Sequence, residues 1–254
     1  MFCTNIDLEK LDYKAPQANT RGGKNLHVST VPGSSDWADH IRFQMSEDNT
    51  QHLQSVVWGL DQPPPPGQQD GRRTLELTVE SPALLTFLEN LDSKNVETAV
   101  AQTTEWFRKT LEPAAIKSKY VPLLKPPQKA DARSTVKVKV KGSDEKKPTN
   151  VYVVQETGNV NEIRHCQGSM DDVTRNSKCV VIVETNGLWF MPLQFGMSLT
   201  ATDILVWPNR QRKVTTGIDA FTFGTDTVLQ SVTEEQKPSD APLPTEVPMS
   251  DKSM

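Results

Sequence analysis

Alternating apolar and polar residues predict short β-strands over most of the chain. In the runs TLELTV and VKVKVK an apolar side chain recurs at every second position, which is the period of a strand with one buried face. Gly, Asn and Pro residues, which favour turns, separate these runs. The predicted strands are 26–31, 39–44, 54–60, 74–79, 134–142, 151–156, 179–185, 188–196, 203–208 and a last pair near 214–223.

One stretch has helical periodicity instead. Ser81 and Pro82 predict a helix start, because Ser caps the first backbone amides and Pro suits the first helical position. Leu residues follow at helical spacing up to Leu91, and a second apolar stripe predicts another helix over about 95–111. Two tandem helices between strands indicate an α+β, β-rich protein, and the short strands favour a small barrel or sandwich.

The segments outside this pattern define the predicted domain organisation. The segment DQPPPPGQQDG at 61–71 has four consecutive prolines and is predicted as a solvated loop between two strands. Residues 231–254 are rich in Pro, Ser and acids, which predicts a disordered C-terminal tail. Residues 1–25 are predicted as a flexible arm, and 26–230 as a single domain that includes the helices near 82–111.

Composition excludes several protein classes. Within the 254 residues no apolar run approaches the roughly 18–20 residues of a membrane span. The first residues, MFCTNIDLEK, lack the basic stretch and apolar core of a secretory signal. Three cysteines are too few for a disulfide scaffold. We therefore expect an intracellular protein.

Charge is segregated along the chain. The formal net charge is −4, but residues 117–150 hold ten Lys or Arg against Asp131, Asp144 and Glu145. Residues 234–254, by contrast, hold more acids than lysines. The basic middle is suited to phosphates, and an acidic tail can compete for a cationic groove or recruit partners.

The basic middle contains a regular stripe of lysines. Side chains alternate along a strand, so Lys137, Lys139 and Lys141 share one face, spaced about 6.6–7 Å apart. That spacing is close to the phosphate repeat of an extended nucleic-acid strand. An equally good interpretation is an exposed edge strand that its lysines protect from aggregation.

Aromatic residues accompany cations in the C-terminal half. Trp207 is followed by Arg210, Arg212 and Lys213, and Trp189 and Phe195 lie on neighbouring predicted strands. Proteins that bind single strands stack bases on aromatic rings while cations follow the phosphates. For each single aromatic residue, burial in the core is the alternative. The predicted nucleic-acid-binding residues are Lys137, Lys139, Lys141, Tyr152, Trp189, Phe195, Trp207, Arg210, Arg212 and Lys213.

Catalytic and metal-binding motifs are absent from the sequence. It contains no HExxH, GxSxG or P-loop frame, so we expect no enzyme activity and no cofactor. His165, Cys166 and Cys179 lack the short paired spacing of a zinc site, so no metal is expected. The remaining enzymatic hypothesis pairs His165 with Asp171 or Asp172.

The order of segments resembles a known family. A GGK segment is followed by Trp106-Phe107 in the helical insertion, a basic β region, and then CVVIVETNGLWF and FGMSLTATDILVWP. This layout, over about residues 20–225, is similar to the single-stranded-DNA-binding proteins of large nucleocytoplasmic DNA viruses. The resemblance implies an OB-like barrel with a two-helix insertion and a disordered acidic tail.

The resemblance also implies a function. It implies sequence-nonspecific binding of single-stranded nucleic acid, DNA rather than RNA, in replication, recombination or repair. The location would be the host nucleus or a cytoplasmic viral factory, with replication proteins recruited through the tail. The alternative is a non-enzymatic structural or virion-associated interaction protein without nucleic-acid affinity, which contacts its partners through 63–66 and the tail.

Overall fold

The computed structural model describes most of the chain up to residue 209. The described residues are 2–20, 22–34, 36–46, 53–60, 73–127, 129, 132–155, 164–207 and 209. The predicted loop at 61–71, the last predicted strand pair and the C-terminal tail therefore lie outside them. None of the described helices is long and apolar enough to cross a membrane.

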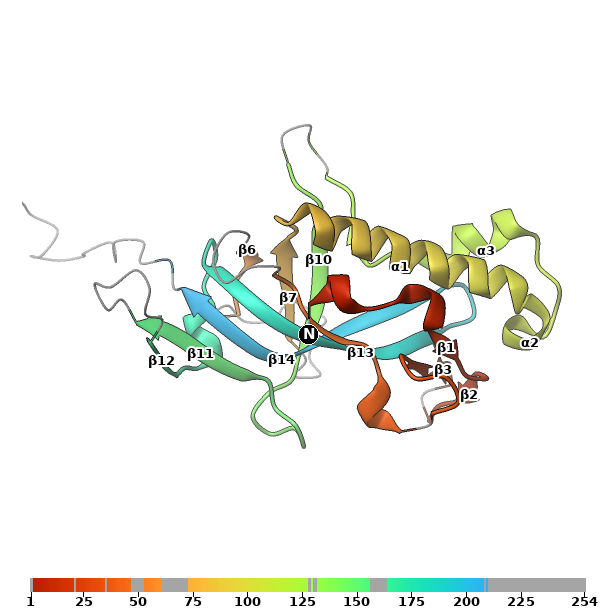
Figure 1. The fold of residues 1–254 in the computed structure, drawn as a ribbon, viewed down its shortest axis with the longest axis horizontal. Helices are drawn as coiled ribbons and strands as arrows, with labels where there is room; N and C mark the ends of the chain where they lie inside the picture. The colour runs from red at the N-terminus through yellow and green to blue at the C-terminus, as the bar shows by residue number, and fades with distance from the viewer. Residues whose placement is uncertain are drawn as a thin grey trace, which may run out of the picture. The chain divides into compact units, whose positions relative to one another are not determined.

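Strands dominate the described part of the chain, as Figure 1 shows. The strands are β1 (Asp12–Tyr13), β2 (Gln17–Ala18), β3 (Lys24–Leu26), β4 (Val28–Ser29), β5 (Arg42–Gln44), β6 (Gln54–Trp58), β7 (Arg73–Thr78), β8 (Tyr120–Val121), β9 (Leu124–Lys125), β10 (Thr135–Val140), β11 (Asn150–Gln155), β12 (Arg164–Gln167), β13 (Lys178–Phe190) and β14 (Phe195–Trp207). The α-helices are α1 (Pro82–Ala101), α2 (Thr103–Phe107) and α3 (Pro113–Lys119). Short 3₁₀ turns are η1 (Cys3–Asn5), η2 (Leu8–Lys10), η3 (Trp37–Asp39) and η4 (Met170–Asp172).

Among the described residues, five strands pair into a closed ring. β6 pairs with β7, β7 with β10, β10 with β14, β14 with β13, and β13 returns to β6. All of these pairs are antiparallel except β10–β14, which is parallel. Numbered along the chain, the ring order is 1-2-3-5-4, which is the order of an OB-fold barrel. The predicted β-rich α+β fold with an OB-like barrel is confirmed.

The barrel interior is filled by the apolar members of the alternating strands. Val136 and Val138 of β10 are fully buried, as are Leu75 and Leu77 of the neighbouring β7. The polar members of the same strands face outward, as the period of two predicts. The lysine stripe is therefore on the outside of the barrel because the valines occupy its inside.

Helix α1 starts where the sequence predicts but continues further. The Ser81 hydroxyl accepts a hydrogen bond from the Leu84 amide at 3.1 Å, and Pro82 opens the helix. The predicted boundary before residue 95 is wrong, because α1 continues to Ala101 and the shorter α2 and α3 follow. Asn95 explains the error. It is fully buried on the packed face of α1, so a polar residue interrupts the apolar stripe in the sequence although the helix continues.

The N-terminal segment is part of the domain, which corrects the prediction of a flexible arm over 1–25. Cys3 is 1% exposed and Leu11 is 8% exposed, and both belong to the core cluster. η1 and η2 lie along α1 (Figure 1). The Tyr13 hydroxyl donates to Asn95 Oδ1 at 2.8 Å, so a polar residue of α1 also holds this segment.

The strands predicted at 179–185 and 188–196 form one long strand and a turn. β13 runs through Asn186-Gly187 without reversing, because Gly187 adopts a φ of +76° at an irregularity in the β13–β14 register. The chain reverses later, at 191–194, and β14 then runs 13 residues to Trp207. The Asn-Gly pair is therefore part of a bulge and not a hairpin turn.

A carboxylate on α1 anchors the chain that follows the helices. Asp92 accepts hydrogen bonds from the Tyr120 hydroxyl at 2.6 Å, from the Leu123 amide at 2.9 Å and from the Leu124 amide at 3.4 Å. We expect Asp92→Ala to lower the free energy of unfolding by about 1–3 kcal/mol, because these donors lose a shared acceptor in a mostly buried place. Urea unfolding followed by circular dichroism measures the change.

Glu89→Ala is the matched control for this prediction. Glu89 lies one turn earlier on the same helix, and its side chain is exposed. We expect its replacement to change the unfolding free energy by less than about 0.5 kcal/mol. Equal effects of the two substitutions would show that Asp92 contributes no more than an ordinary surface carboxylate.

Candidate nucleic-acid interface

Trp189 lies on the outer side of the barrel near the end of β13. It pairs with Gly196 of β14, and a Cβ atom built on Gly196 would lie 3.1 Å from Trp189 Cζ2. The glycine therefore leaves the space along which the indole lies. Trp189 is half-buried, whereas the adjacent Phe190 is 6% exposed. The two aromatics face opposite sides, as the alternation along the strand predicts.

A groove of about 1070 Å³ runs beside Trp189, and we call it the Trp189 groove. Its lining comes from three places: the N-terminal strands β2 and β3 with their flanking residues, the end of the β13–β14 hairpin, and β10. The lining residues are Lys14, Ala15, Gln17, Ala18, Asn19, Thr20, Gly23, Asn25, Leu26, His27, Lys139, Gly187, Trp189, Phe190, Met191, Gln194 and Ser198.

The groove combines an aromatic surface with cations and side-chain amides. Lys139 reaches it from β10, next to the β14 strand that carries Gly196. Gln17, Asn19 and Asn25 contribute amide groups from the N-terminal wall. These groups can donate to phosphate oxygens or to base edges.

Two basic residues of the N-terminal wall contribute less charge than their type implies. Lys14 Nζ lies 2.8 Å from the Asp12 carboxylate, so this cation is paired. Partial burial lowers the pKa of His27, and the nearby His40 and Lys14 lower it further. His27 is therefore neutral at pH 7, and Lys139 brings an ammonium group to the groove from β10.

The lysine stripe is divided by its surroundings. Lys137 and Lys139 are exposed, whereas Lys141 Nζ lies 3.3 Å from Glu184, whose other carboxylate oxygen is 3.1 Å from His40 Nε2. The protected-edge interpretation is wrong, because β10 pairs with β7 on one side and with β14 on the other. Phosphate contact by the three lysines stays a prediction.

Phe195 is a core residue. It is 1% exposed, and its ring stacks on Phe190 with centroids 5.4 Å apart and an interplanar angle of 6°. Phe107 and Tyr120 pack edge-on against the same ring. This burial corrects the prediction that Phe195 stacks a base, because its faces are covered by other rings.

The other predicted aromatics do not join Trp189. Trp207 pairs with Lys178 at the opposite end of the β13–β14 hairpin from the Trp189–Gly196 pair. Tyr152 lies near that far end on β11, with its ring 5.5 Å from the His165 ring. The predicted cations Arg210, Arg212 and Lys213 lie outside the described residues.

The sequence reasoning missed the N-terminal wall of the groove. Gln17, Asn19 and Asn25 fall in the predicted flexible arm, and His27 falls in a predicted strand to which no binding role is assigned. A usable signal was the Gly22-Gly23 pair between polar residues, because Gly22 has a φ of +80° in the connection between β2 and β3. A tight strand connection there would have placed two strands in the supposed arm.

The hypothetical enzymatic residues are used structurally or lie apart. His165 is exposed on β12, whereas the Asp172 carboxylate accepts hydrogen bonds from the Ser169 amide at 2.7 Å and hydroxyl at 3.1 Å, capping η4. Cys179 is fully buried in β13, and burial raises the pKa of its thiol to about 12. In the described ranges, no three His, Cys, Asp or Glu side chains converge as metal ligands would.

Comparison with protein families decides the relationship of this chain. Residues 68–222, more than half of the sequence, match the family of unknown function DUF5871. The chain belongs to this family. The DUF5871 match includes β7, the helices and the later barrel strands, and it begins after the N-terminal wall of the Trp189 groove. No curated protein matches the chain.

Solved structures of a single-stranded DNA-binding protein from bacteriophage Enc34 show a distant likeness. The complex with single-stranded DNA has 11% identity and a TM-score of 0.38, covering 76% of this chain and 93% of the phage chain. The C-terminal truncation has 11% identity and a TM-score of 0.40, covering 79% and 96%. A further structure of that protein has 10% identity and a TM-score of 0.39, covering 81% and 97%. All three scores are below 0.5, so the fold assignment rests on this DUF5871 chain's own strand order. The resemblance of the chain to the single-stranded-DNA-binding proteins of large nucleocytoplasmic DNA viruses stays a prediction.

Gly187 sets the distance between the hairpin and the N-terminal wall. A Cβ atom at this position would lie 2.0 Å from the Leu26 carbonyl oxygen. We expect Gly187→Ala to destabilise the protein by at least about 1 kcal/mol more than the left-handed backbone alone costs, because one backbone must move away from the other. Thermal and urea unfolding measure the change.

Gly33→Ala separates the two contributions. Gly33 has a φ of +79°, close to that of Gly187, but no atom lies within 4 Å of a Cβ built there. Its replacement should therefore cost about 1–2 kcal/mol from the left-handed backbone alone. If Gly187→Ala costs no more than Gly33→Ala, the close approach to β3 does not constrain the groove.

Proposed function

We propose that this DUF5871 protein binds single-stranded DNA in the Trp189 groove without sequence preference. The observation that carries the proposal is that Trp189 and Lys139 line the same groove. An indole face stacks any of the four bases, and an ammonium group neutralises a phosphate in any sequence. Together these two contacts give an affinity that does not depend on the base sequence.

The geometry favours a single strand over a duplex. Stacking on Trp189 requires a base with a free face, and duplex bases have theirs covered by neighbouring base pairs. No described helix lines the groove, and its walls are strands and loops. A flexible single strand can follow such a wall with its bases turned inward.

The fold supports this placement by analogy. OB folds bind oligonucleotides over their second and third strands and through the loop between the fourth and fifth. Here Lys139 lies on the third barrel strand, and Met191 and Gln194 lie in the loop after the fourth. Fold alone does not give function, so the side chains of the groove carry the argument.

The wider role follows from the binding mode. We propose that the protein covers exposed single strands during DNA replication, recombination or repair, and that its acidic tail recruits other replication proteins. A viral source, with action in the host nucleus or a viral factory, is part of this proposal. We propose no catalytic step, because covering a strand needs none.

Binding to labelled oligo(dT) tests the proposal. We expect Trp189→Ala to weaken binding about 5- to 140-fold, from the loss of about 1–3 kcal/mol of stacking. Lys139→Ala should weaken binding and reduce the slope of log K against log salt by about 0.7, because one fewer counterion is released. Fluorescence anisotropy at four salt concentrations measures both.

Matched controls identify the groove. Trp207→Ala removes a half-buried tryptophan at the other end of the hairpin, and Lys146→Ala removes an exposed lysine outside the groove. Both should leave the affinity within about twofold. An effect of Trp207→Ala as large as that of Trp189→Ala would place binding elsewhere.

The comparison ligands distinguish the remaining alternatives. Oligo(U) and duplex DNA of equal length should bind more weakly than oligo(dT). If the wild-type protein binds no oligonucleotide at 50 mM salt, the alternative of a structural or virion-associated interaction protein replaces this proposal.

A further inference from the structure

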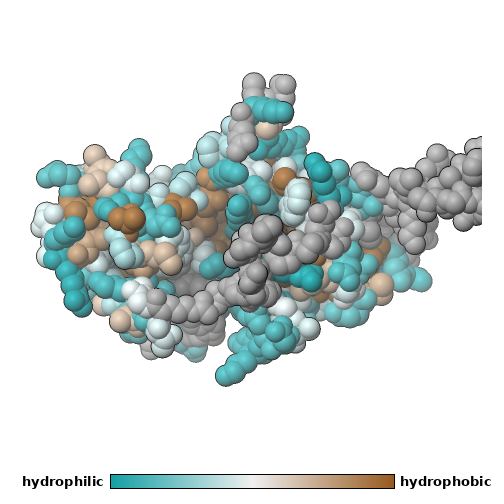
Figure 2. Space-filling view, turned by 180° about the vertical axis from the view of Figure 1, so that it is seen from behind, coloured by the Kyte–Doolittle hydropathy of each residue, from teal (hydrophilic) through white to brown (hydrophobic). Residues whose placement is uncertain are grey.

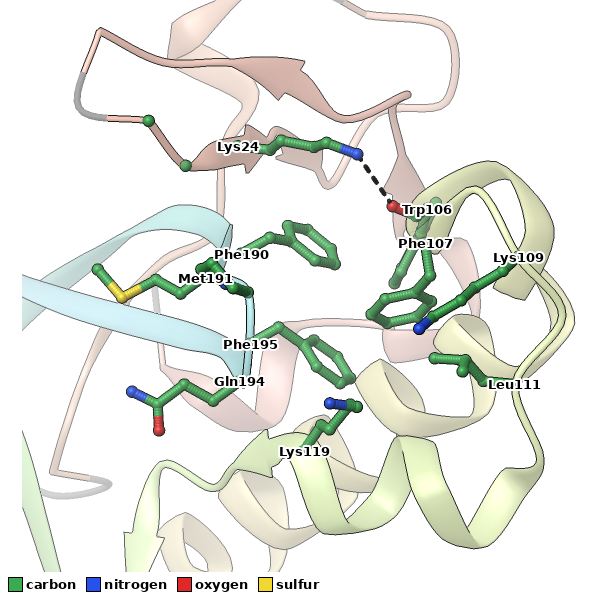
Figure 3. Close-up of a pocket in the computed structure, with 13 residues that line it drawn as sticks. Lys24, Trp106, Phe107, Lys109, Leu111, Lys119, Phe190, Met191, Gln194 and Phe195 are labelled. Atoms are coloured by element: carbon green, nitrogen blue, oxygen red, sulfur yellow. Dashed lines mark hydrogen bonds between the residues drawn. The ribbon is translucent and has the colours of Figure 1, made fainter.

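A second cavity of about 340 Å³ opens beside the Trp189 groove, and we call it the α2 pocket (Figure 3). Three separate segments form it: residues 22–24 up to the first residue of β3, the chain from the end of α2 to Leu111, and residues 190–195, which are the β13–β14 turn and the strand residues on either side of it. Lys119 of α3 completes the wall. The helical insertion, not the barrel alone, therefore builds this pocket.

Aromatic rings form one side of the α2 pocket. Phe107, Phe190 and Phe195 point toward one another in Figure 3. Phe107 packs edge-on against the other two, with centroids 5.8 Å and 5.3 Å away. Phe190 and Phe195 are buried by this packing, whereas Phe107 is half-buried. Phe107 is therefore the ring with surface left to contact a ligand.

Three lysines surround these rings. Lys24 Nζ donates to the Trp106 carbonyl and Lys119 Nζ to the Leu193 carbonyl, both at 3.5 Å, which are long bonds to neutral acceptors. Lys109 is exposed and points toward the same space (Figure 3). The described residues that line the pocket include no Asp or Glu. The pocket therefore favours an anion attached to an apolar or aromatic group.

The α2 pocket is continuous with the Trp189 groove. Gly23, Phe190, Met191 and Gln194 line both cavities. A strand bound in the groove therefore reaches the pocket without crossing another surface. The volume lies at the lower end of the range for small-molecule sites, which suits one nucleotide and not a folded partner.

We propose that the α2 pocket holds one nucleotide of the bound strand, with its base against Phe107 and its phosphate between Lys109 and Lys119. This inference rests on the proposed function and adds a second base site to it. The strand then leaves the groove through a pocket that the helical insertion creates, and the insertion takes part in binding.

The surroundings of the pocket leave its mouth open. Met191 and Leu193 of the adjoining turn are 61% and 80% exposed, and Val121 after α3 is 38% exposed. Figure 2 shows apolar residues gathered among hydrophilic ones at this end of the molecule. The flexible Met191 side chain borders both cavities, so it lies between the two proposed base sites.

Substitutions in the α2 pocket test the inference with labelled dT₂₀ by fluorescence anisotropy. We expect Phe107→Ala to weaken binding about fivefold or more through the lost base contact. Phe107→Leu, which keeps apolar packing against the other rings, should also weaken binding if stacking matters. Lys109→Ala should weaken binding and reduce the salt slope by about 0.7, whereas Lys117→Ala, exposed on α3 outside the pocket, should not.

Photo-crosslinking gives a second, independent readout. A dT₂₀ strand that carries 5-bromodeoxyuridine should crosslink to a peptide that contains Phe107, and mass spectrometry identifies that peptide. Circular dichroism of each variant confirms that it is folded. Folded variants whose affinity equals that of wild type, with no crosslink at 103–111, overturn the inference.

The outcomes separate this inference from the proposed function. If Trp189→Ala weakens binding while the Phe107 and Lys109 variants do not, the groove stands and the pocket inference fails. If the wild-type protein binds no dT₂₀, both fail as stated. If a labelled acidic peptide with one Phe binds and Lys109→Ala abolishes that binding while dT₂₀ affinity is unchanged, the pocket serves a protein partner and the inference is wrong.

Discussion

The pairing of β13 with β14 is the interaction on which the rest of the structure depends. Each strand has 13 residues, against a mean of about 5–6 for strands in globular proteins. Within the barrel these strands are the fourth and fifth, and their pairings with β6 and β10 close the ring. The β13–β14 hairpin continues beyond the barrel, and there the outer edges of β13 and β14 pair with other strands.

The part of the hairpin beyond the ring positions the candidate site. β3 pairs with residues 188–190 of β13, and β8 pairs with the start of β14. These pairings bring the N-terminal segment and the end of the helical insertion to the same place. Trp189 lines the Trp189 groove alone, whereas the adjacent Phe190, whose side chain points to the opposite side of the strand, also lines the α2 pocket. A shorter hairpin would close the same barrel and leave neither cavity.

The sequence predicts local features well because their causes are local. Alternation predicts β7 and β10, and a Ser-Pro pair predicts the start of α1. The predictions are wrong where the conformation or burial of a residue depends on a contact with a residue far away in sequence. Asn95 is a core residue because the Tyr13 and Tyr120 hydroxyls bond to it, from 82 residues earlier and 25 residues later. Gly187 forms a bulge because Leu26 lies against it.

The candidate site shows the same division between local and distant causes. Alternation correctly places the lysines of β10 outside the barrel, and it makes Trp189 and Phe190 face opposite ways. It cannot show that Phe195 is covered by Phe107 and Tyr120, because those rings come from the helical insertion and the strand that follows it. Strand order, which assembles the groove, depends on pairings between segments far apart in sequence.

The net charge of the chain is therefore a poor guide to its binding surface. Lys141 belongs to the basic middle, yet its charge is compensated by Glu184, 43 residues later. Lys24 and Lys109 both precede the basic middle at 117–150. They nevertheless face the α2 pocket, which no described Asp or Glu lines. In the folded chain a lysine of the basic middle is thus paired with a carboxylate, while lysines from outside the basic middle lie together at the α2 pocket. For the proposed binding of a single strand, a small number of such lysines suffices, because each phosphate contact adds counterion release to the affinity whatever the charge of the remote surface. An acidic chain can in this way carry a locally cationic surface, which is what the proposed binding of a single strand requires.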